Sequence, residues 1–364
     1  MAGVVPGSTN SLADVAGVRV GHAQRTEDGW RTGVTVVVPP PKGAVCGVDV
    51  RGAAPGTRET DLLDPRNLVE RVHAVVLSGG SAFGLAAATG VMESLAEDGV
   101  GFPVRPDVVV PIVPAAVIFD LGRGGLPRMT PGPALGATAY LAAVDPDQAG
   151  SGQVGWGGVG WGQVGPGRVG VAQGNVGAGA GAAVLGGQLA GGVGSASAVV
   201  DGVTVAALAV VNAAGSPVDL DTGDLYAARL ALPGEYPPLG PVDAGRLAAW
   251  RSGLAGPGSF NTVIGVVATD VVLTKAQCAR LAGAGHDGLA RAVRPAHLMT
   301  DGDAIFGLAT ATGAAPDLLG FNTLLGTAAD VFARAIGHAV LAATGWPGVP
   351  SYREVLGIAA ERPR

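Results

Sequence analysis

The chain has 364 residues, of which 48% are hydrophobic and only 4% aromatic, and it contains 62 glycines. This length suffices for one large domain or two ordinary ones, with a sizeable core. The formal net charge of -6 argues against a polyanion-binding surface, because affinity for a phosphate backbone needs clustered Lys and Arg. Nucleic acid is therefore not an expected partner.

Neither a disulfide framework nor a targeting segment is expected. Cys46 and Cys278 show no CxxC metal spacing and are predicted to be small buried hydrophobic residues. The first residues lack the basic and apolar regions of a secretory signal, and no uncharged apolar run is long enough to span a bilayer. We expect a cytoplasmic protein without a membrane partner.

The first part of the chain predicts strands and then a strand, turn and helix unit. Short β-rich runs separated by Gly, Pro and charged turns fill residues 18–50. A buried strand is predicted at 72–77, followed by a Ser-Gly-Gly-Ser break at 78–81 and an Ala- and Leu-rich helix at 82–97.

The middle of the chain is dominated by glycine. Residues 150–195 hold repeated Gly-Trp and Gly-Val pairs, and we predict that the first half of this stretch is a surface insertion. Strand-like runs return at 197–211. A polar, Pro-rich connection then covers 216–259, with an exposed linker predicted at 233–241.

The last third mixes strands and helices. A buried strand is predicted at 262–269, helices at 275–282 and 287–293, and a short strand at 304–309. A final helix places its apolar residues on one face, namely Leu325, Ala329, Phe332, Ile336 and Val340. The best class is a layered α/β or α+β domain whose sheets are covered by helices.

The tripeptide Phe-Asn-Thr occurs twice, at 260–262 and 321–323, in two different contexts. Asn322 or Thr323 is predicted to cap the C-terminal helix. Thr262 instead ends a polar loop and opens a buried strand, where a helix cap has no use.

Thr262 is a candidate nucleophile of a particular kind. Its hydroxyl can attack the carbonyl of Asn261 through a five-membered ring, convert the peptide bond to an ester, and free Thr262 as a new N-terminus. The product carries a hydroxyl and an α-amino group whose ordinary pKa of about 7.7 to 8.0 leaves part of it unprotonated near neutrality. Nucleophile and base would then belong to one residue.

Two further motifs stand near predicted strand ends. Asp301-Gly302-Asp303 puts two carboxylates on one side if strand conformation reaches back to it, and a turn is the alternative interpretation. Gly79, Gly80 and Ser81 begin a helix, where backbone N–H groups suit a carboxylate, an oxyanion or no ligand.

A different class of function rests on the glycines at 177–182. Gly177, Gly179 and Ala182 match a GxGxxA dinucleotide fingerprint, with Asp201 at a passable distance. This pattern would need a strand, turn and helix there. The five histidines show no metal-ligand spacing, so each is predicted to be structural, and no metal or other cofactor is expected.

Several long segments, in order, resemble the family that includes the DmpA L-aminopeptidase/D-amidase, the β-peptidyl aminopeptidases and the endo-type 6-aminohexanoate (nylon) oligomer hydrolases. They are DVRGAAPGTRETDLLDP (49–65), VVLSGGSAFGLAAATGVMESL (75–95), VPIVPAAVIFDLG (110–122), GNVGAGAGA (174–182), FNTVIGVVATD (260–270) and MTDGDAIFGLAT (299–310).

The resemblance implies a four-layer αββα sandwich in one domain, 1–364, cut into a large fragment 1–261 and a small fragment 262–364 that stay together. It implies Thr262 as nucleophile and base, Asp301 and Asp303 as the acids that position it, and Asn212 and Tyr140 as residues of the oxyanion region. Gly79, Gly80 and Ser81 are assigned to the substrate or oxyanion region because of their N–H groups at a helix start. A homotetramer of cleaved protomers acting on a small amide is also implied.

Departures within the resemblance bear on the substrate. The oligomer hydrolases carry a lysine shortly after the GAGxGA run, and this chain has none until Lys275. The combination of Thr262 at the junction and Asp301-Gly302-Asp303 downstream nevertheless resembles the nylon-oligomer branch more than the aminopeptidase branch. This resemblance favours endo-type cleavage of linear ω-amino acid amides. Aminopeptidase activity on short peptides, a non-catalytic relative and a dinucleotide-binding protein remain alternatives.

Overall fold

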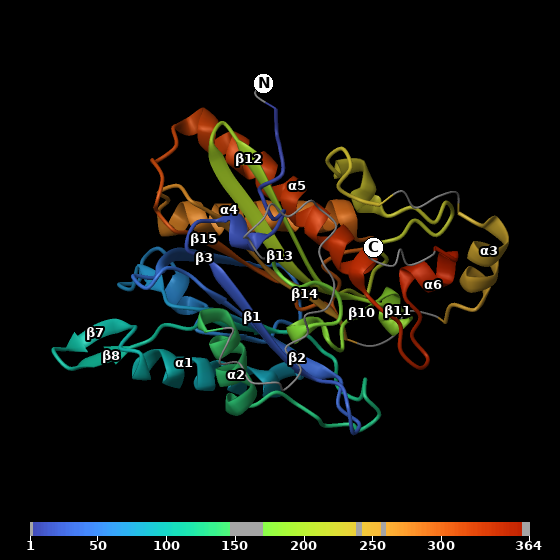
Figure 1. Cartoon of the computed structure of the whole chain (residues 1–364), viewed down its shortest axis with the longest axis horizontal. Coiled ribbons are helices and arrows are strands. Elements are labelled where there is room, and N and C mark those ends of the chain that lie inside the picture. Colours follow the sequence, from blue (N-terminus) through green and yellow to red (C-terminus); the bar gives the residue numbers. More distant parts are fainter. Residues whose placement is uncertain (1–2, 146–169, 238–241, 256–259, 359–364) are drawn as a thin grey trace.

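Two β-sheets face one another and carry the helices on their outer surfaces (Figure 1). The computed structural model describes residues 3–145, 170–237, 242–255 and 260–358. The predicted Gly-Trp surface insertion lies mostly outside these ranges. Sheet I has the strand order β1-β2-β6-β9-β4, and sheet II has the order β12-β13-β14-β15-β3-β5.

Sheet I consists of β1 (Arg19–Arg25), β2 (Thr32–Val38), β6 (Val75–Ser78), β9 (Ala115–Val117) and β4 (Thr57–Arg58). Sheet II consists of β12 (Gly192–Val200), β13 (Val203–Asn212), β14 (Thr262–Thr269), β15 (Ala304–Ala309), β3 (Ala44–Val50) and β5 (Arg71–Val72). Two small antiparallel pairs are β7 (Phe102–Arg105) with β8 (Val108–Val110), and β10 (Ala183–Val184) with β11 (Leu189–Ala190).

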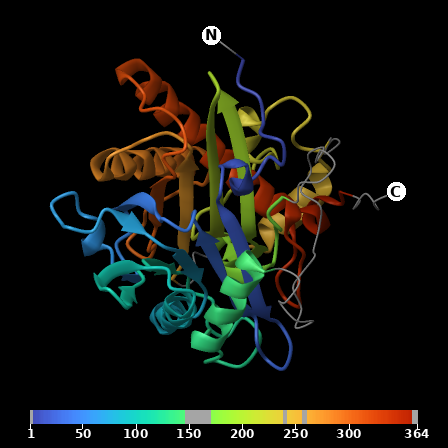
Figure 2. The ribbon, with the colours of Figure 1, turned by 60° about the vertical axis from the view of Figure 1, so that its left-hand side comes forward.

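The helices form the two outer layers (Figure 2). Helices α1 (Ala87–Glu97) and α2 (Pro133–Val144) pack on sheet I, and α4 (Lys275–Ala292) and α5 (Leu318–Ala342) pack on sheet II. The shorter α3 (Ala244–Ser252) and α6 (Tyr352–Leu356) contact each other. The order of layers is thus helix, sheet, sheet, helix, as the sequence resemblance implied.

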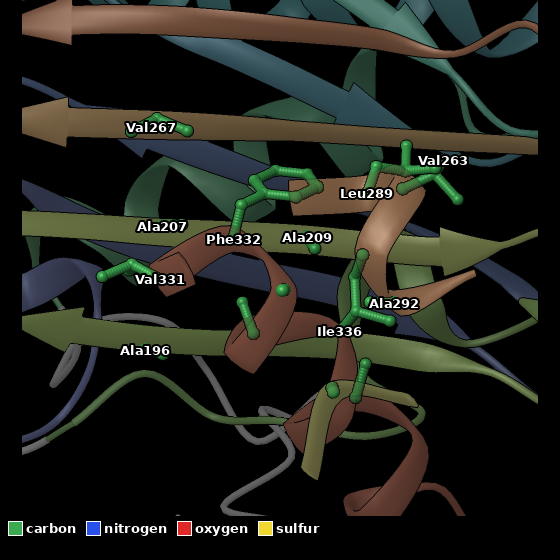
Figure 3. Close-up of a cluster of buried hydrophobic side chains, with 14 of the residues drawn as sticks. Ala196, Ala207, Ala209, Val263, Val267, Leu289, Ala292, Val331, Phe332 and Ile336 are labelled. Carbon is green, nitrogen blue, oxygen red and sulfur yellow. The ribbon is translucent and has the colours of Figure 1, made fainter. Parts of the chain in front are cut away.

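Each pair of neighbouring layers encloses its own apolar cluster. Strand β14 shows how one strand serves two of them, because all of its residues are buried and its side chains alternate between faces. Ile264 and Val266 point between the sheets, whereas Val263 and Val267 point toward α4 and α5. Figure 3 shows that second cluster, in which Phe332 and Ile336 of α5 pack against sheet II.

Helix α5 is the central helix of the outer layer on sheet II. The apolar face predicted from the sequence is confirmed, since Phe332, Ile336 and Val340 are fully buried. The helix is long and apolar enough to cross a membrane, but 83% of its apolar window is buried within the protein, as in the core helix of a layered fold.

The predicted cap of α5 was wrong. The helix begins at Leu318, and the side chain of Asp317 accepts a hydrogen bond from the Gly320 N–H. Asn322 and Thr323 therefore lie inside the first turns, where the Thr323 hydroxyl donates to the Leu319 carbonyl. Asp317 is a better cap than Asn322 or Thr323 because its negative charge also interacts favourably with the positive end of the helix dipole.

The segment expected to be an exposed linker at 233–241 is anchored where it is described. Glu235 is buried, and its carboxylate accepts hydrogen bonds from Arg334 (Nε to Oε2, 2.7 Å) and His338 (Nε2 to Oε1, 2.9 Å), both on α5. The Asn10 amide donates to the same carboxylate at 2.8 Å. This buried ionic cluster ties the N-terminal segment and residue 235 to sheet II and α5.

Replacing Glu235 with Gln is expected to lower the free energy of unfolding by about 3 to 5 kcal/mol, because it leaves the Arg334 guanidinium buried without its counter-ion. Urea denaturation checks this. Arg251→Ala is the matched control, since it breaks the exposed Arg251–Asp221 pair and should cost at most about 1 kcal/mol. Equal losses in the two variants would contradict a buried ionic anchor.

The same cluster makes the free energy of unfolding depend on pH in the acid range. Burial acts to raise the pKa of Glu235, but the hydrogen bonds from His338 and Arg334 outweigh it and lower the pKa from 4.5 to about 2. The contribution of this group is therefore complete above the unfolded-state pKa and is lost as the pH falls from about 4.5 to about 2. Glu235→Gln should flatten the stability profile in that window.

Candidate active site

Three chain segments that are far apart in sequence meet where the central strands β13, β14 and β15 of sheet II begin or end. Asn212 at the end of β13 pairs in register with Thr262 at the start of β14. Strand β15 runs parallel to β14, so the loop before it reaches the same place, where Asn261 and Asp301 form a β-bridge. Four predicted site residues, Thr262, Asp301, Asp303 and Asn212, are thus brought together with the predicted cleavage bond.

The Thr262 side chain lies on the face of β14 that looks between the two sheets, since it shares strand parity with Ile264 and Val266. It is buried in the continuous chain, with 5% exposure. Its hydroxyl donates a hydrogen bond to the carbonyl of Asn261, the carbonyl that it would attack in self-cleavage. The Gly302 N–H donates to that same carbonyl oxygen at 3.2 Å.

Gly302 has to be a glycine at this point. A Cβ there would lie 2.5 Å from the Ala54 carbonyl oxygen and 3.0 Å from the Thr262 hydroxyl oxygen. The sequence predicted the two acids but gave the residue between them no role. Its backbone N–H approaches the Asn261 carbonyl closely enough to polarise it.

The two acids are buried, with 2% exposure each, and hold different groups. Asp303 accepts the Val263 N–H on Oδ1 at 2.7 Å, so it holds the backbone immediately after Thr262. Asp301 accepts the Leu298 N–H on Oδ2 at 2.8 Å. Burial, together with the charge of Asp303, raises the pKa of Asp301, although the backbone hydrogen bond opposes this.

Asn212 faces Thr262 and is held on both sides. Its Oδ1 accepts the Ala183 N–H at 3.0 Å, and its Nδ2 donates to the Phe119 carbonyl at 3.1 Å. An amide nitrogen carries two hydrogens, and among the described residues Nδ2 donates to no acceptor other than the Phe119 carbonyl. Asn261 is tied to the same small strand, because its Nδ2 donates to the Ala183 carbonyl at 3.4 Å.

The turn at Gly79, Gly80 and Ser81 binds a carboxylate, but one of the protein's own. The Gly80 N–H donates to Asp120 Oδ1 at 2.6 Å, while the Gly79 and Ser81 N–H groups donate to the carbonyls of Gly33 and Ile118. Burial raises the pKa of Asp120 to about 6, although the hydrogen bond from the Gly80 N–H acts to lower it. The turn supports the 118–120 segment beside Asn212, and its N–H groups are not free to bind an oxyanion.

Tyr140 does not join the site. It lies on α2, in the apolar cluster between sheet I and the helices α1 and α2, so the whole of sheet I separates it from Thr262. Its hydroxyl donates to Asp98 at 2.6 Å, and burial together with that hydrogen bond raises the pKa of the Tyr140 hydroxyl well above its usual value. The predicted oxyanion role for Tyr140 was wrong.

His297 was missed by the sequence analysis. Its Nδ1 lies 2.7 Å from Asp303 Oδ2, so this histidine contacts the acid that holds the backbone next to Thr262. The two residues lie six positions apart in the sequence, and no regular period links them, so spacing alone gave no signal.

The dinucleotide interpretation was also wrong. Residues Gly177–Gly179 form a single 3₁₀ turn rather than the start of an α-helix, and Asp201 lies in the tight turn between β12 and β13. Within the described ranges, no three His, Cys, Asp or Glu side chains lie close enough to hold a metal ion. Cys46 and Cys278 are free and buried, as predicted.

Comparison with known proteins identifies the family of the chain. The profile of peptidase family S58 matches residues 10–353. An uncharacterized aminopeptidase of Mycobacterium tuberculosis is 46% identical over 369 residues, covering 95% of this chain and 98% of the relative. A similar uncharacterized aminopeptidase of Mycobacterium leprae is 45% identical, covering 94% of this chain and 93% of the relative.

Two solved structures share the architecture. The L-aminopeptidase D-Ala-esterase/amidase from Ochrobactrum anthropi, a variant of the Ntn hydrolase fold, has a TM-score of 0.67 at 21% identity, covering 97% of this chain and 95% of that one. A β-aminopeptidase from a Burkholderia species has a TM-score of 0.66 at 21% identity, covering 98% and 96%. The chain therefore belongs to peptidase family S58, and it is a hydrolase of peptide or amide bonds built on the Ntn hydrolase fold.

Proposed function

We propose that the chain cleaves itself between Asn261 and Thr262 and then acts as an N-terminal threonine hydrolase on small peptides or amides. The observation that carries this proposal is the hydroxyl of Thr262 lying against the Asn261 carbonyl, whose oxygen also receives the Gly302 N–H. A nucleophile and a donor for the developing negative charge thus meet on one peptide bond.

The self-cleavage step is an N-to-O acyl shift followed by hydrolysis. Thr262 Oγ1 bonds to the Asn261 carbonyl carbon, the C–N bond breaks, and the hydroxyl proton passes to the leaving nitrogen. Water then hydrolyses the ester, leaving a carboxylate on Asn261 and a free amine and hydroxyl on Thr262. The fragments would stay together because β14 pairs with β13 and β15 pairs with β3, and both β13 and β3 belong to the large fragment.

In the mature protein the α-amino group of Thr262 takes the hydroxyl proton as the oxygen attacks a substrate carbonyl. The acyl-threonine ester that forms is released by water. Asp301 supports this role, since its Oδ1 has no hydrogen-bond partner among the described residues and can accept from the new ammonium. The second Nδ2 hydrogen of Asn212 and the Gly302 N–H are suited to the substrate oxyanion.

Two substrate classes remain, each favoured by a particular observation. The names of the mycobacterial relatives favour an aminopeptidase acting on short peptides with a free amine. Thr262 followed by Asp301-Gly302-Asp303 favours cleavage of linear ω-amino acid amides, by resemblance to the nylon-oligomer branch. Both classes use the same nucleophile.

The experiment compares a β-amino acid p-nitroanilide and a short peptide with an amine-blocked 6-aminohexanoate oligomer. An aminopeptidase cleaves only the free-amine substrates, and blocking their amine abolishes hydrolysis. Endo-type cleavage of the blocked oligomer at a comparable rate supports the second class. A protein that cleaves neither, while remaining one chain, would be a non-catalytic relative and would end the proposal.

Gly302→Ala is expected to slow self-cleavage about tenfold or more, because the added Cβ pushes the backbone away from the Asn261 carbonyl and crowds the Thr262 hydroxyl. The half-time of fragment appearance after synthesis measures this. Gly326→Ala on α5 is the control, because a Cβ there meets nothing within 4 Å. Unchanged cleavage in Gly302→Ala would remove this backbone donor from the mechanism.

A further inference from the structure

Residues 297 and 298 contact both acids of the site from one short stretch of chain. The Leu298 N–H donates to Asp301, and the His297 ring donates to Asp303 through Nδ1. His297 adopts a left-handed backbone conformation with φ of 59°, which a non-glycine residue rarely adopts. That conformation lets consecutive side-chain and backbone groups reach the two carboxylates.

The bond between His297 and Asp303 continues to the nucleophile's strand. One oxygen of Asp303 receives the histidine, and the other receives the Val263 N–H. The carboxylate is therefore fixed at both oxygens, and its orientation sets where β14 begins. Because Thr262 is the residue directly before Val263, a rotation of Asp303 would shift the nucleophile.

His297 is placed between the buried acid and solvent. Its side chain is 21% exposed, whereas Asp303 is 2% exposed. It lines an open cavity of about 720 Å³, whose polar lining includes Ser216, Asp219, Asp221, Tyr226 and Arg294. The cavity lies on the helix side of sheet II, because α4 contributes Ala290, whereas Thr262 faces the space between the sheets.

The surroundings of the pair contain several other charged or titratable groups. His286 on α4 contacts the His297 ring edge-on at 5.0 Å, and its Nε2 donates to the Asp49 carbonyl. Burial lowers the pKa of His286 to about 4, so it is neutral near pH 7. The remaining groups are Asp301 in the same loop, Asp49 and Arg51 beside His286, and Asp219, Asp221 and Arg294 on the cavity wall.

We propose that His297 is a positioning residue for the reaction, which locks the Asp303 carboxylate and thereby the amine and hydroxyl of Thr262 in the reactive geometry. The inference rests on the proposed function. A structural role alone would affect folding, whereas a positioning role acts on turnover. His297 would also reduce the negative charge that Asp303 presents to the new α-amino group.

The test measures kcat, KM and self-cleavage half-time in His297→Ala and His297→Asn, on the full chain. His297→Ala should lower kcat by about tenfold to a hundredfold, the range expected when a reacting group moves by about 1 Å. The KM should stay within about twofold, because substrate binding is not the step that is lost. His297→Asn keeps a neutral donor at a similar place and should recover part of the rate.

Two readouts separate positioning from folding. Added imidazole can enter the open cavity and should partly restore the rate of His297→Ala. The acid limb of its pH profile for kcat/KM should also move to higher pH, because an unshielded Asp303 carboxylate raises the pKa of the nearby α-amino group. His73→Asn is the control, since that ring accepts a backbone N–H from Ile112, in the segment between β8 and β9 and away from the site.

The outcomes are distinct. A cleaved, active wild-type protein with a His297→Ala variant of unchanged kcat and pH profile overturns this inference alone. The inference is also overturned if His297→Ala loses activity with neither imidazole rescue nor a shifted pH profile, and His73→Asn loses activity to the same extent. If His297→Ala does not fold, the recovery and pH profile of His297→Asn decide the question. A wild-type protein that neither cleaves itself nor hydrolyses an amide overturns both the inference and the proposed function.

Discussion

Thr262→Ala is expected to leave the protein as one chain of 35.6 kDa without measurable amide hydrolysis. The variant lacks the hydroxyl that lies against the Asn261 carbonyl, so neither the acyl shift nor the later attack on substrate has a nucleophile. Thr262→Ser should cleave itself and retain activity, because it keeps the hydroxyl and the new amine. A denaturing gel and a substrate assay on the same samples measure both effects.

The second Phe-Asn-Thr copy provides a matched control. Thr323 follows the same two residues but lies inside α5, with its hydroxyl bonded to the Leu319 carbonyl. Thr323→Ala should therefore cleave and turn over like the wild-type protein. Cleavage in Thr262→Ala, or amide hydrolysis by that variant, would contradict the assignment of Thr262.

Asn212→Ala is expected to lower kcat by about a hundred- to a thousandfold, the usual loss when one donor to a developing oxyanion is removed. The truncation also frees the Phe119 carbonyl and the Ala183 N–H, so thermal stability must be measured alongside the rate. The KM should change much less than kcat, because the donor acts mainly in the transition state.

Asn175→Ala separates the two effects of that change. Asn175 is likewise held by backbone on both sides, with its Nδ2 on the Gly191 carbonyl and its Oδ1 on the Thr344 N–H. The Asn175→Ala variant should lose thermal stability without a comparable loss of kcat. If the two variants lose activity in proportion to their stability, Asn212 has only a structural role.

Sequence patterns predicted the elements whose signal is local and periodic. The uninterrupted apolar run after Thr262 requires a strand buried on both faces, and α5 shows its five-residue apolar face, with four members buried and Leu325 partly buried. The grouping of Thr262 with Asp301 and Asp303 was implied by the family resemblance. In the structure these residues come together because β15, which begins directly after Asp303, runs parallel to β14.

The errors concern features that local sequence does not contain. The role of Tyr140 was predicted from a loose segment match. The sequence of a helix does not determine which face of which sheet the helix covers, and α2 covers the outer face of sheet I. The residues from Gly177 to Ala182 match the GxGxxA sequence pattern, but Gly177–Gly179 form a single 3₁₀ turn instead of the start of an α-helix. His297 reaches Asp303 through a left-handed residue, so no strand or helix period relates them. Glu235 looked exposed because its buried partners lie about a hundred residues away on α5.

The intact mass of the purified wild-type protein tests the central claim most directly. The proposal predicts two polypeptides, residues 1–261 and 262–364, whose masses together exceed that of the continuous chain by one water, with threonine as the first residue of the smaller one. A single 35.6 kDa species that hydrolyses amides, or a cut at any other bond, would contradict it.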